Sequence, residues 1–436
     1  MTSVLFILKV LIACLIMMFI LHLTLRNKYM VIYMTIVVFA ITTYEWLTNQ
    51  TIRISLQFIQ LNMTDLLTIY LVISVMLLNS KNINSLRYPR VIRYLLYLTL
   101  IIFIFSMIRG FFLNEFALVI EDIRRLVISF FIPLICYIYL PIEIEDVKVK
   151  KIIGNFAKWI VIYCMICWIL DIFLGIKIMP PQSDAGSTMR VLRPEQALVV
   201  AMFAVYSVYS DLILKRNRYI SLGSFSLIIV VILLQHRSTW VALAVGLIYT
   251  LIACNWISIR NLNNKTISIK LLLQFLFLLL CVPILLFVFR NSEILTELQL
   301  GLMGINANDG GTYNYRQQLW AAHLSGLNSI EWLIGKPFGS GYYVQLTGYF
   351  RDITPHSAYV QTIIRCGILG TAALVILLMV TIRESSRRKL IWGTSICLML
   401  LVFWYPYSYS FYASIGLAFV IKSLRLKKGG IEYEKN

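Results

Sequence analysis

Charged residues are scarce in this chain, and several familiar sequence patterns are missing from it. Only 14% of its 436 residues are charged, whereas 60% are hydrophobic. A soluble domain needs more polar cover than this, so lipid is the expected solvent. Internal repeats, low-complexity tracts and the short alternating segments of a membrane β-barrel are not evident either, which leaves helical spans as the expected architecture.

Acidic residues are fewer than basic ones, at 20 against 39, which gives a formal net charge of +19. The lysines and arginines lie mostly in short loops between apolar blocks, so they indicate membrane topology, and nucleic acid is not an expected partner. The eight cysteines fall in or at the edge of apolar blocks. We interpret them as small core residues, including the closely spaced pair Cys164 and Cys167.

The apolar blocks have roughly the 17 to 25 residues that a helix needs to cross a bilayer. They predict an all-α, polytopic integral membrane protein with about 12 to 13 transmembrane helices in a single domain over residues 1–436. The predicted spans are Val4 to Leu25, Met30 to Leu47, Met63 to Leu78, Tyr94 to Phe111, Leu126 to Leu140, Phe156 to Leu174, Gln196 to Leu212, Ile220 to Leu234, Val241 to Ile257, Leu271 to Phe289, Ala358 to Thr381, Ile391 to Trp404 and Tyr407 to Ile421.

One alternating set of loops is consistently basic and includes the C-terminal tail, so the positive-inside rule places it, with the C-terminus, in the cytoplasm. The other set faces outward. Its longest member runs from Arg290 to His356, far longer than an ordinary helix connection. We expect this periplasmic loop to carry short helices, because its aromatic and glycine content argues against disorder.

Arginines in outward loops have no topological reason to be there. We single out Arg190, Arg193, Arg237, Arg316 and Arg351. Several guanidinium groups around one outer cavity would suit a phosphorylated lipid headgroup, because they bind phosphate bidentately and stay charged. The alternative is that each one reaches ordinary lipid phosphates at the interface.

Three of these arginines lie in informative settings. Pro194, directly after Arg193, predicts a helix start and hence an anion site. Arg237 occupies a short turn between apolar blocks and must lie at the water interface or in a hydrated cavity. Arg316 shares one helical stripe with Leu319, Trp320 and His323, which predicts a helix lying flat on the membrane.

His356 is the candidate general base. It stands where the long outer loop enters an apolar helix, and near neutral pH an imidazole can accept the proton of an attacking sugar hydroxyl. The alternative is a structural, cap-like histidine. Arg365, two to three turns further along the same predicted span, should face a protein partner or a hydrated cavity, because an unpaired charge there is costly.

The second half of the chain resembles the bacterial O-antigen ligase and polysaccharide polymerase superfamily. The resemblance rests on a hairpin-tip arginine in QHRSTW, on an arginine and tryptophan helix followed by a glycine-rich turn, YRQQLW to IGKPFGSGY, and on PHSAYVQTIIRCGILG. Ser357 stands where many relatives have asparagine, and the predicted span count exceeds the usual twelve of that family by about one.

The resemblance implies a membrane glycosyltransferase that takes a glycan from a polyprenyl pyrophosphate at the outer face of the bacterial inner membrane. His356 would be the base, and Arg316, with one or both of Arg190 and Arg193, would bind the pyrophosphate. Arg237 is a further candidate for that binding. No metal and no cofactor is expected, since the arginines take over charge neutralisation. A chain-length regulator is a conceivable protein partner.

The leading hypothesis is a polymerase that joins lipid-linked repeat units, with an O-antigen ligase acting on a lipid A core as the close alternative. A transporter or flippase of lipid-linked oligosaccharide is the alternative from another class, and it would place charges at the membrane midplane and use discontinuous helices. A protein that serves only as a structural scaffold in the membrane is the remaining alternative. The catalytic hypotheses require His356 and the arginines to meet in one outward pocket.

Overall fold

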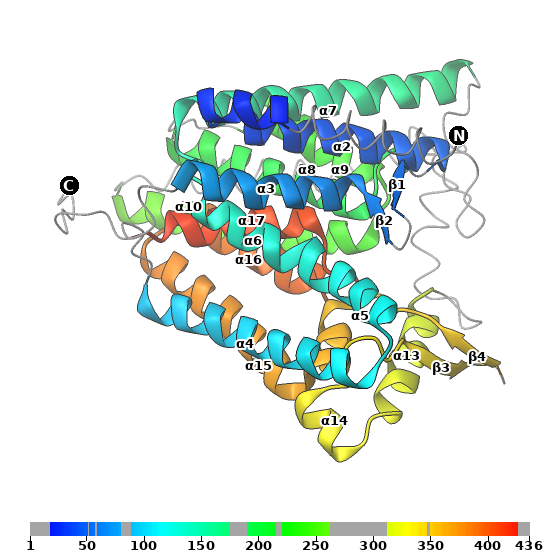
Figure 1. Cartoon of the computed structure of the whole chain (residues 1–436). Coiled ribbons are helices and arrows are strands. Elements are labelled where there is room, and N and C mark those ends of the chain that lie inside the picture. Colours follow the sequence, from blue (N-terminus) through cyan, green and yellow to red (C-terminus); the bar gives the residue numbers. More distant parts are fainter. Residues whose placement is uncertain are drawn as a thin grey trace.

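The computed structural model describes residues 18–50, 52–56, 59–79, 89–174, 190–214, 220–261, 312–346 and 349–425. These residues form mostly helices that run side by side as a bundle (Figure 1). The helices are α2 (Met30–Thr48), α3 (Met63–Asn79), α4 (Arg90–Leu113), α5 (Phe116–Ile123), α6 (Ile132–Tyr139), α7 (Val147–Leu174), α8 (Pro194–Tyr209), α9 (Leu222–Leu233), α10 (Arg237–Asn261), α13 (Thr312–Ser325), α14 (Ser329–Ile334), α15 (Ala358–Arg387), α16 (Ile391–Phe403) and α17 (Phe411–Ser423).

Two π-helical stretches and two short hairpins complete the described part. The π-helical stretches, Arg124–Phe131 and Ser210–Leu214, continue helical runs. Strand β1 (Arg53–Leu56) pairs antiparallel with β2 (Ile59–Asn62), and β3 (Tyr343–Leu346) pairs antiparallel with β4 (Tyr349–Asp352). The prediction of an all-α chain therefore needs a small correction, because two connections between helices satisfy part of their backbone by pairing as hairpins.

Six helices in the described ranges are long and apolar enough to cross a membrane: Met30–Thr48, Arg90–Leu113, Val147–Asp171, Pro194–Leu214, Arg237–Cys254 and Ala358–Arg387. A helical protein of membrane-spanning composition is thus confirmed. Four shorter apolar helices also occur: Met63–Leu78, Leu222–Leu233, Ile391–Phe403 and Phe411–Ser423. The predicted span Leu271 to Phe289, and all but the end of Val4 to Leu25, lie outside the described residues, so the total count stays a prediction.

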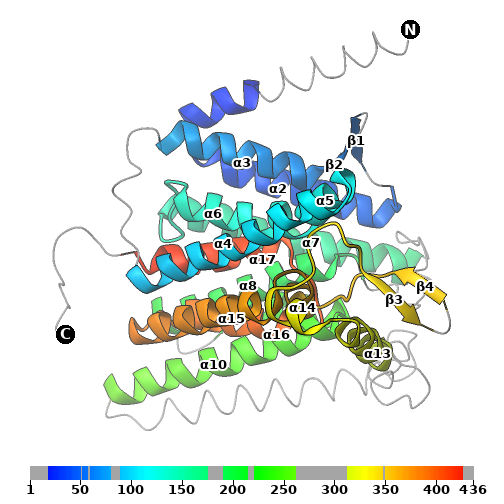
Figure 2. The ribbon, with the colours of Figure 1, turned by 60° about the horizontal axis from the view of Figure 1, so that its bottom comes forward.

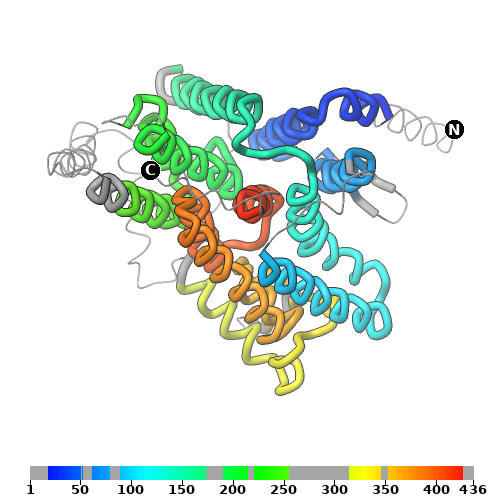
Figure 3. The backbone as a smooth tube through the Cα atoms, turned by 90° about the vertical axis from the view of Figure 1, so that its left-hand side faces the viewer, coloured from blue at the N-terminus to red at the C-terminus, as the bar shows by residue number. Residues whose placement is uncertain are grey.

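Helix α17 lies in the middle of the bundle, as the view along the helices shows (Figure 3). It is only 13 residues long, and nearly all of them are buried. Its Ser410 side chain caps the first turn by accepting from the Ala413 amide at 3.3 Å. A helix that is apolar all round is stable where other helices cover it on every side, so α17 organises the core.

The two ends of the bundle collect different loops. At one end Tyr29 donates to Asp146 at 2.5 Å, Arg425 lies 3.9 Å from Glu143, and Arg388 donates to the Leu424 carbonyl at 2.6 Å. These segments all belong to the basic set of loops that the sequence assigns to the cytoplasm. The opposite end carries both hairpins and α13 (Figure 1). Which end faces the cytoplasm remains a prediction from the positive-inside rule.

Helix α15 is broken at Gly367, whose backbone has φ +63° and ψ −166°. The glycine-rich segment after α14 packs against this break. The Lys336 amide donates to the Ile364 carbonyl at 2.6 Å, and the Ser106 hydroxyl donates to the Arg365 carbonyl at 2.5 Å. The carbonyls freed by the break are therefore satisfied by the protein's own groups, as a helix interruption within a membrane protein requires.

Replacing Gly367 with alanine should destabilise the protein by about 2 kcal/mol or more. An added Cβ would lie 2.2 Å from the Leu333 carbonyl oxygen, at a backbone conformation that favours glycine. The measurement is thermal unfolding of the purified protein in detergent. The matched control is Gly154→Ala in the interior of α7, where a Cβ meets nothing within 4 Å, and which should be neutral or slightly stabilising. Equal melting temperatures for the two variants would contradict this account of the break.

The buried arginine of α15 has a partner that the sequence did not identify. Arg365 is fully buried and lies 2.7 Å from the carboxylate of Asp122 in α5. It also donates to the Ser340 hydroxyl and to the Gly341 carbonyl, and it stacks on Tyr342 at 4.2 Å. This ion pair ties α15, α5 and the segment before β3 together.

Asp122→Ala should destabilise the protein by about 3 to 5 kcal/mol, because it leaves the Arg365 charge buried without its counter-ion. The neighbouring Glu121 provides the matched control. Its exposed pair with Arg125, at 2.6 Å and one helical turn away, should contribute less than about 0.5 kcal/mol. Thermal unfolding of Asp122→Ala and Glu121→Ala side by side tests the contrast, and similar losses in both would refute it.

Candidate functional site

The start of α8 is anchored to the end of α2 by one buried glutamine. Gln196 accepts from the Arg193 amide at 3.0 Å, and its side-chain nitrogen donates to the Phe39 carbonyl, Thr42 and Thr43 at 2.9 to 3.0 Å. Pro194 occupies the first turn of α8, as the sequence predicts. This anchoring fixes the backbone that carries Arg190 and Arg193 at the end of the bundle opposite to the basic loops.

Arg193 is partly neutralised by a carboxylate. Its guanidinium lies 3.7 Å from Glu45, which is 6% exposed, and over the Trp46 ring at 5.8 Å. Glu45 also accepts from the Ile52 amide at 2.8 Å, and Trp46 donates to the Arg190 carbonyl at 2.9 Å. The sequence analysis did not identify Glu45, because a single carboxylate at the end of an apolar block carries no pattern.

Arg237 is the first residue of α10, and the preceding histidine fixes its place. The His236 ring forms a hydrogen bond of 2.7 Å with the Leu192 carbonyl, which couples this turn to the segment that holds Arg190 and Arg193. Burial lowers the pKa of His236 to about 4, and the nearby charge of Arg190 adds to this effect. His236 is therefore a neutral structural residue at pH 7.

Helix α13 lies crosswise to the bundle and is seen nearly end-on where α10 and α15 run across the picture (Figure 2). Its predicted stripe faces protein: Leu319, Trp320 and His323 are buried. Trp320 donates to the Pro355 carbonyl at 2.5 Å, and Arg316 donates to the Pro406 carbonyl at 2.9 Å. The stripe therefore holds α13 on the beginning of α15, which is a different role from the membrane contact that its spacing suggested.

His356 lies between Pro355, whose carbonyl accepts from Trp320 of α13, and the first turn of α15. The helix cap is the next residue, Ser357, which accepts from the Val360 amide at 3.5 Å, so the cap role considered for His356 falls to its neighbour. His356 has φ +48°, an uncommon value for a residue other than glycine. Its ring is exposed, and no described residue forms a hydrogen bond with it.

The charged side chains that change the pKa values of His356 and Arg316 must lie close to them. Partial loss of hydration and the charge of Arg316 both lower the pKa of His356. Loss of hydration lowers the pKa of Arg316 too; nearby Tyr407 opposes this effect, and Arg237 adds to it. Tyr407 in turn donates a 3.1 Å hydrogen bond to the carboxylate of Glu195. His356, Arg316, Arg237, Tyr407 and Glu195 thus belong to one neighbourhood.

Two of the arginines lack a carboxylate partner within the part of the chain that the structure describes. Arg237 forms no hydrogen bond or ion pair there, and Arg316 donates only to a carbonyl. By contrast, two other arginines near this end are paired, Arg124 with Asp65 at 3.4 Å and Arg125 with Glu121 at 2.6 Å. Arg316, which lies close to His356, and Arg237, which lies close to Arg316, are therefore the guanidinium groups that no described carboxylate neutralises, and they can bind an anion from outside the protein.

Tyr407 and Glu195 complete the neighbourhood, and the sequence analysis gave neither a site role. Glu195, in the first turn of α8, accepts a hydrogen bond of 3.1 Å from Tyr407. The aromatic run from Trp404 to Tyr409 between two apolar blocks is the sequence signal that could have indicated this part of the site. Arg351 lies in β4, and its side chain is outside the described residues.

Within the described ranges, no group of three or more His, Cys, Asp or Glu side chains could hold a metal ion. Comparisons of the chain with family models, with curated proteins and with solved structures give no match. The site must therefore be interpreted from its own chemistry. It has two guanidinium groups without a carboxylate partner among the described residues, an exposed imidazole close to one of them, and a hydrogen-bonded pair of a tyrosine and a carboxylate nearby.

Proposed function

We propose that the protein is a membrane glycosyltransferase that polymerises a surface polysaccharide. It would transfer a glycan from a polyprenyl pyrophosphate to a sugar hydroxyl of a second lipid-linked glycan at the periplasmic face of the bacterial inner membrane. The observation that supports this most is that Arg237 and Arg316 have no carboxylate partner among the described residues, and that Arg316 lies close to the exposed His356. The resemblance of the second half of the chain to polysaccharide polymerases and ligases points to the same chemistry.

In this proposal the neutral imidazole of His356 accepts the proton of the acceptor hydroxyl while that oxygen attacks the anomeric carbon of the donor. The bond from this carbon to the pyrophosphate oxygen breaks, and its electron pair leaves with the polyprenyl pyrophosphate. Arg316 and Arg237 stabilise the negative charge that develops on the leaving group, and Arg190 and Arg193 contribute from the start of α8. The proton on His356 is released to water before the next transfer.

A ligase would use the same groups, so the acceptor separates the two functions. The purified protein should lengthen glycans when only the lipid-linked repeat unit is supplied, and a ladder of products on a gel is the expected result. Products that form only after lipid A core is added would assign the ligase function instead. Failure of both reactions, with a protein that remains folded, would count against both proposals.

The broken helix α15 is the one observation that favours the transporter alternative, because transporters bind substrates at discontinuous helices. Here, however, the carbonyls at the break are occupied by Lys336 and Ser106, and the nearby charge of Arg365 is paired with Asp122. The carbonyls of Ile364 and Arg365 and the guanidinium of Arg365 are therefore already bound by protein groups. Catalysis by the groups at the end of the bundle is therefore the better supported function.

A further inference from the structure

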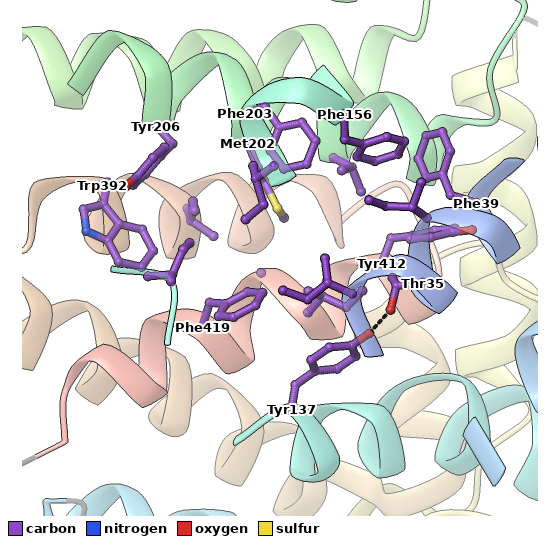
Figure 4. A pocket seen from close by; sticks show the side chains of 18 residues that line it. Thr35, Phe39, Tyr137, Phe156, Met202, Phe203, Tyr206, Trp392, Tyr412 and Phe419 are labelled. Atoms are coloured by element: carbon purple, nitrogen blue, oxygen red, sulfur yellow. Dashed lines mark hydrogen bonds between the residues drawn. The ribbon is translucent and has the colours of Figure 1, made fainter. Parts of the chain in front are cut away.

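An apolar cavity lies among α2, α6, α7, α8, α16 and α17 (Figure 4). It measures about 880 Å³ when its open mouth is counted. Phe39 and Phe156 lie at one end of it, and Tyr206 and Trp392 lie at the other. Because α2, α7 and α8 have the composition of membrane spans and α16 and α17 are shorter apolar helices, the substance available to fill the cavity through its mouth is hydrocarbon.

Some of the polar atoms in the lining are already satisfied by the protein. The Tyr137 hydroxyl forms a hydrogen bond with Thr35, and the Tyr412 hydroxyl forms one with Thr42 at 2.8 Å. The remaining lining is mostly aliphatic and aromatic carbon. Water has little to bind in such a space, whereas an extended alkyl chain gains from being enclosed.

A second, polar pocket of about 710 Å³ lies at the end of the bundle where the basic loops gather. Acidic and basic side chains line it in equal number, and they are Lys28, Lys422, Arg425, Glu143, Glu145 and Asp146. Lys422 is held inside by the carbonyls of Tyr137 and Leu140. The mixture of charges suits a headgroup that itself carries one charge of each sign.

Three separate chain segments lead from the polar pocket into the apolar cavity. On α17, Ile415 and Phe419 line the cavity, and Lys422, one turn further on, lines the pocket. Next to α2, Lys28 lines the pocket, and Ile32, one turn later, lines the cavity. Between α6 and α7, Ile144 lines the cavity, and its neighbours Glu143 and Glu145 line the pocket. The two spaces are therefore adjacent and lie one above the other.

We propose that the two spaces together bind one zwitterionic phospholipid of the leaflet at that end, such as phosphatidylethanolamine. An acyl chain occupies the apolar cavity. The lipid phosphate lies near Lys28 and Arg425, and the ammonium lies near Glu145 and Asp146. The site is at the opposite end of the bundle from His356, so this lipid is a structural ligand and its binding does not depend on the proposed glycosyl transfer.

A polyprenyl pyrophosphate fits this place poorly. Three carboxylates line the pocket and would repel its several negative charges. Where Phe39 and Tyr412 line the cavity, hydrogen bonds already join Tyr412, Thr42 and Gln196, so these polar groups are not available to a pyrophosphate. The isoprenoid carrier is therefore an outcome of the test that would overturn the proposal.

The test uses the full chain purified in mild detergent and stripped of lipid. Native mass spectrometry after addition of phosphatidylethanolamine should show one retained lipid, and the melting temperature should rise. Phosphatidylglycerol, which lacks the ammonium group, should be retained at least about 10-fold less. Phosphatidylethanolamine with six-carbon chains should bind weakly, because it does not fill the cavity. Equal retention of both headgroups, no retention, or a co-purified polyprenyl phosphate would overturn the proposal.

Two variants with one control sharpen the test. Ile415→Phe narrows the cavity and should reduce retention of the long-chain lipid about 10-fold. Ile248→Phe, on a side chain that is 47% exposed in α10, is the matched control and should retain the lipid. Glu145→Gln removes an exposed carboxylate and should bring phosphatidylglycerol retention closer to that of phosphatidylethanolamine. An unchanged headgroup preference in Glu145→Gln would contradict the placement of the ammonium, even if Ile415→Phe failed to fold.

Discussion

Replacing His356 with alanine should lower the rate of glycan extension by about 100- to 10,000-fold, the usual range for removing a general base. The protein should stay folded, because the ring is exposed and no described residue forms a hydrogen bond with it. The measurement is the initial rate of product formation from a defined lipid-linked repeat unit, with the melting temperature recorded alongside. His22→Ala, which removes another exposed histidine, is the control and should retain full activity. A His356→Ala variant with normal polymerisation in cells would end the catalytic proposal.

The pH dependence of the same reaction gives an independent check on the role of His356. Partial loss of hydration and the charge of Arg316 lower the pKa of His356 from its ordinary 6.5, so the ring is neutral at pH 7 and able to accept a proton. The rate should therefore hold down to below about pH 6.5 and then fall as the imidazole becomes protonated. A rate that begins to fall well above pH 7 would show that another group is the base.

Replacing Arg316 with methionine should lower the rate by about 100-fold or more, because a guanidinium that stabilises a leaving pyrophosphate contributes roughly 3 to 4 kcal/mol in the transition state. Arg316→Lys should recover part of the activity, since lysine keeps the charge and loses the bidentate geometry. Arg237→Met should have a similar effect. The double variant should lose less than the sum of the two, because both groups act on one anion.

Arg316→Met should also change the pH profile. Without its positive charge the pKa of His356 rises toward the ordinary value, so the fall in rate on the acid side should move to higher pH. The control is Arg125→Met, which removes an arginine already paired with Glu121 and should leave both the rate and the profile unchanged. A loss of rate in Arg316→Met without any shift of the profile would place Arg316 away from the reacting imidazole.

The sequence predicted the helical elements well where long apolar blocks define them. Each predicted span within the described residues lies on a helix or on a helical run, including Leu126 to Leu140, which forms a π-helical stretch followed by α6. It did not predict the break in α15. Gly367 lies in an apolar block that looks continuous, and only the close approach of Leu333 to that glycine explains the interruption.

The sequence singled out the basic residues of the candidate site but not the acidic residues. Arginines in the loops that the positive-inside rule assigns to the outer side are unexpected there, and a histidine at the junction of a loop and a predicted span is notable by its position. The acidic partners had no such signal. Glu45, Asp122 and Glu195 are single carboxylates, and the choice of which arginine each one meets depends on helix packing between segments far apart in the chain.

Composition and the spacing of apolar blocks alone determined that this is a helical membrane protein, because a lipid solvent leaves the backbone few other ways to satisfy its hydrogen bonds. Tertiary structure decided which guanidinium groups remain available. Arg365 and Arg193 look like Arg237 and Arg316 in the sequence, yet packing brings a carboxylate to the first two and none of the described carboxylates to the last two. How strongly a guanidinium group can attract a ligand depends on the charges closest to it in space, and the packing of the helices decides which charges those are.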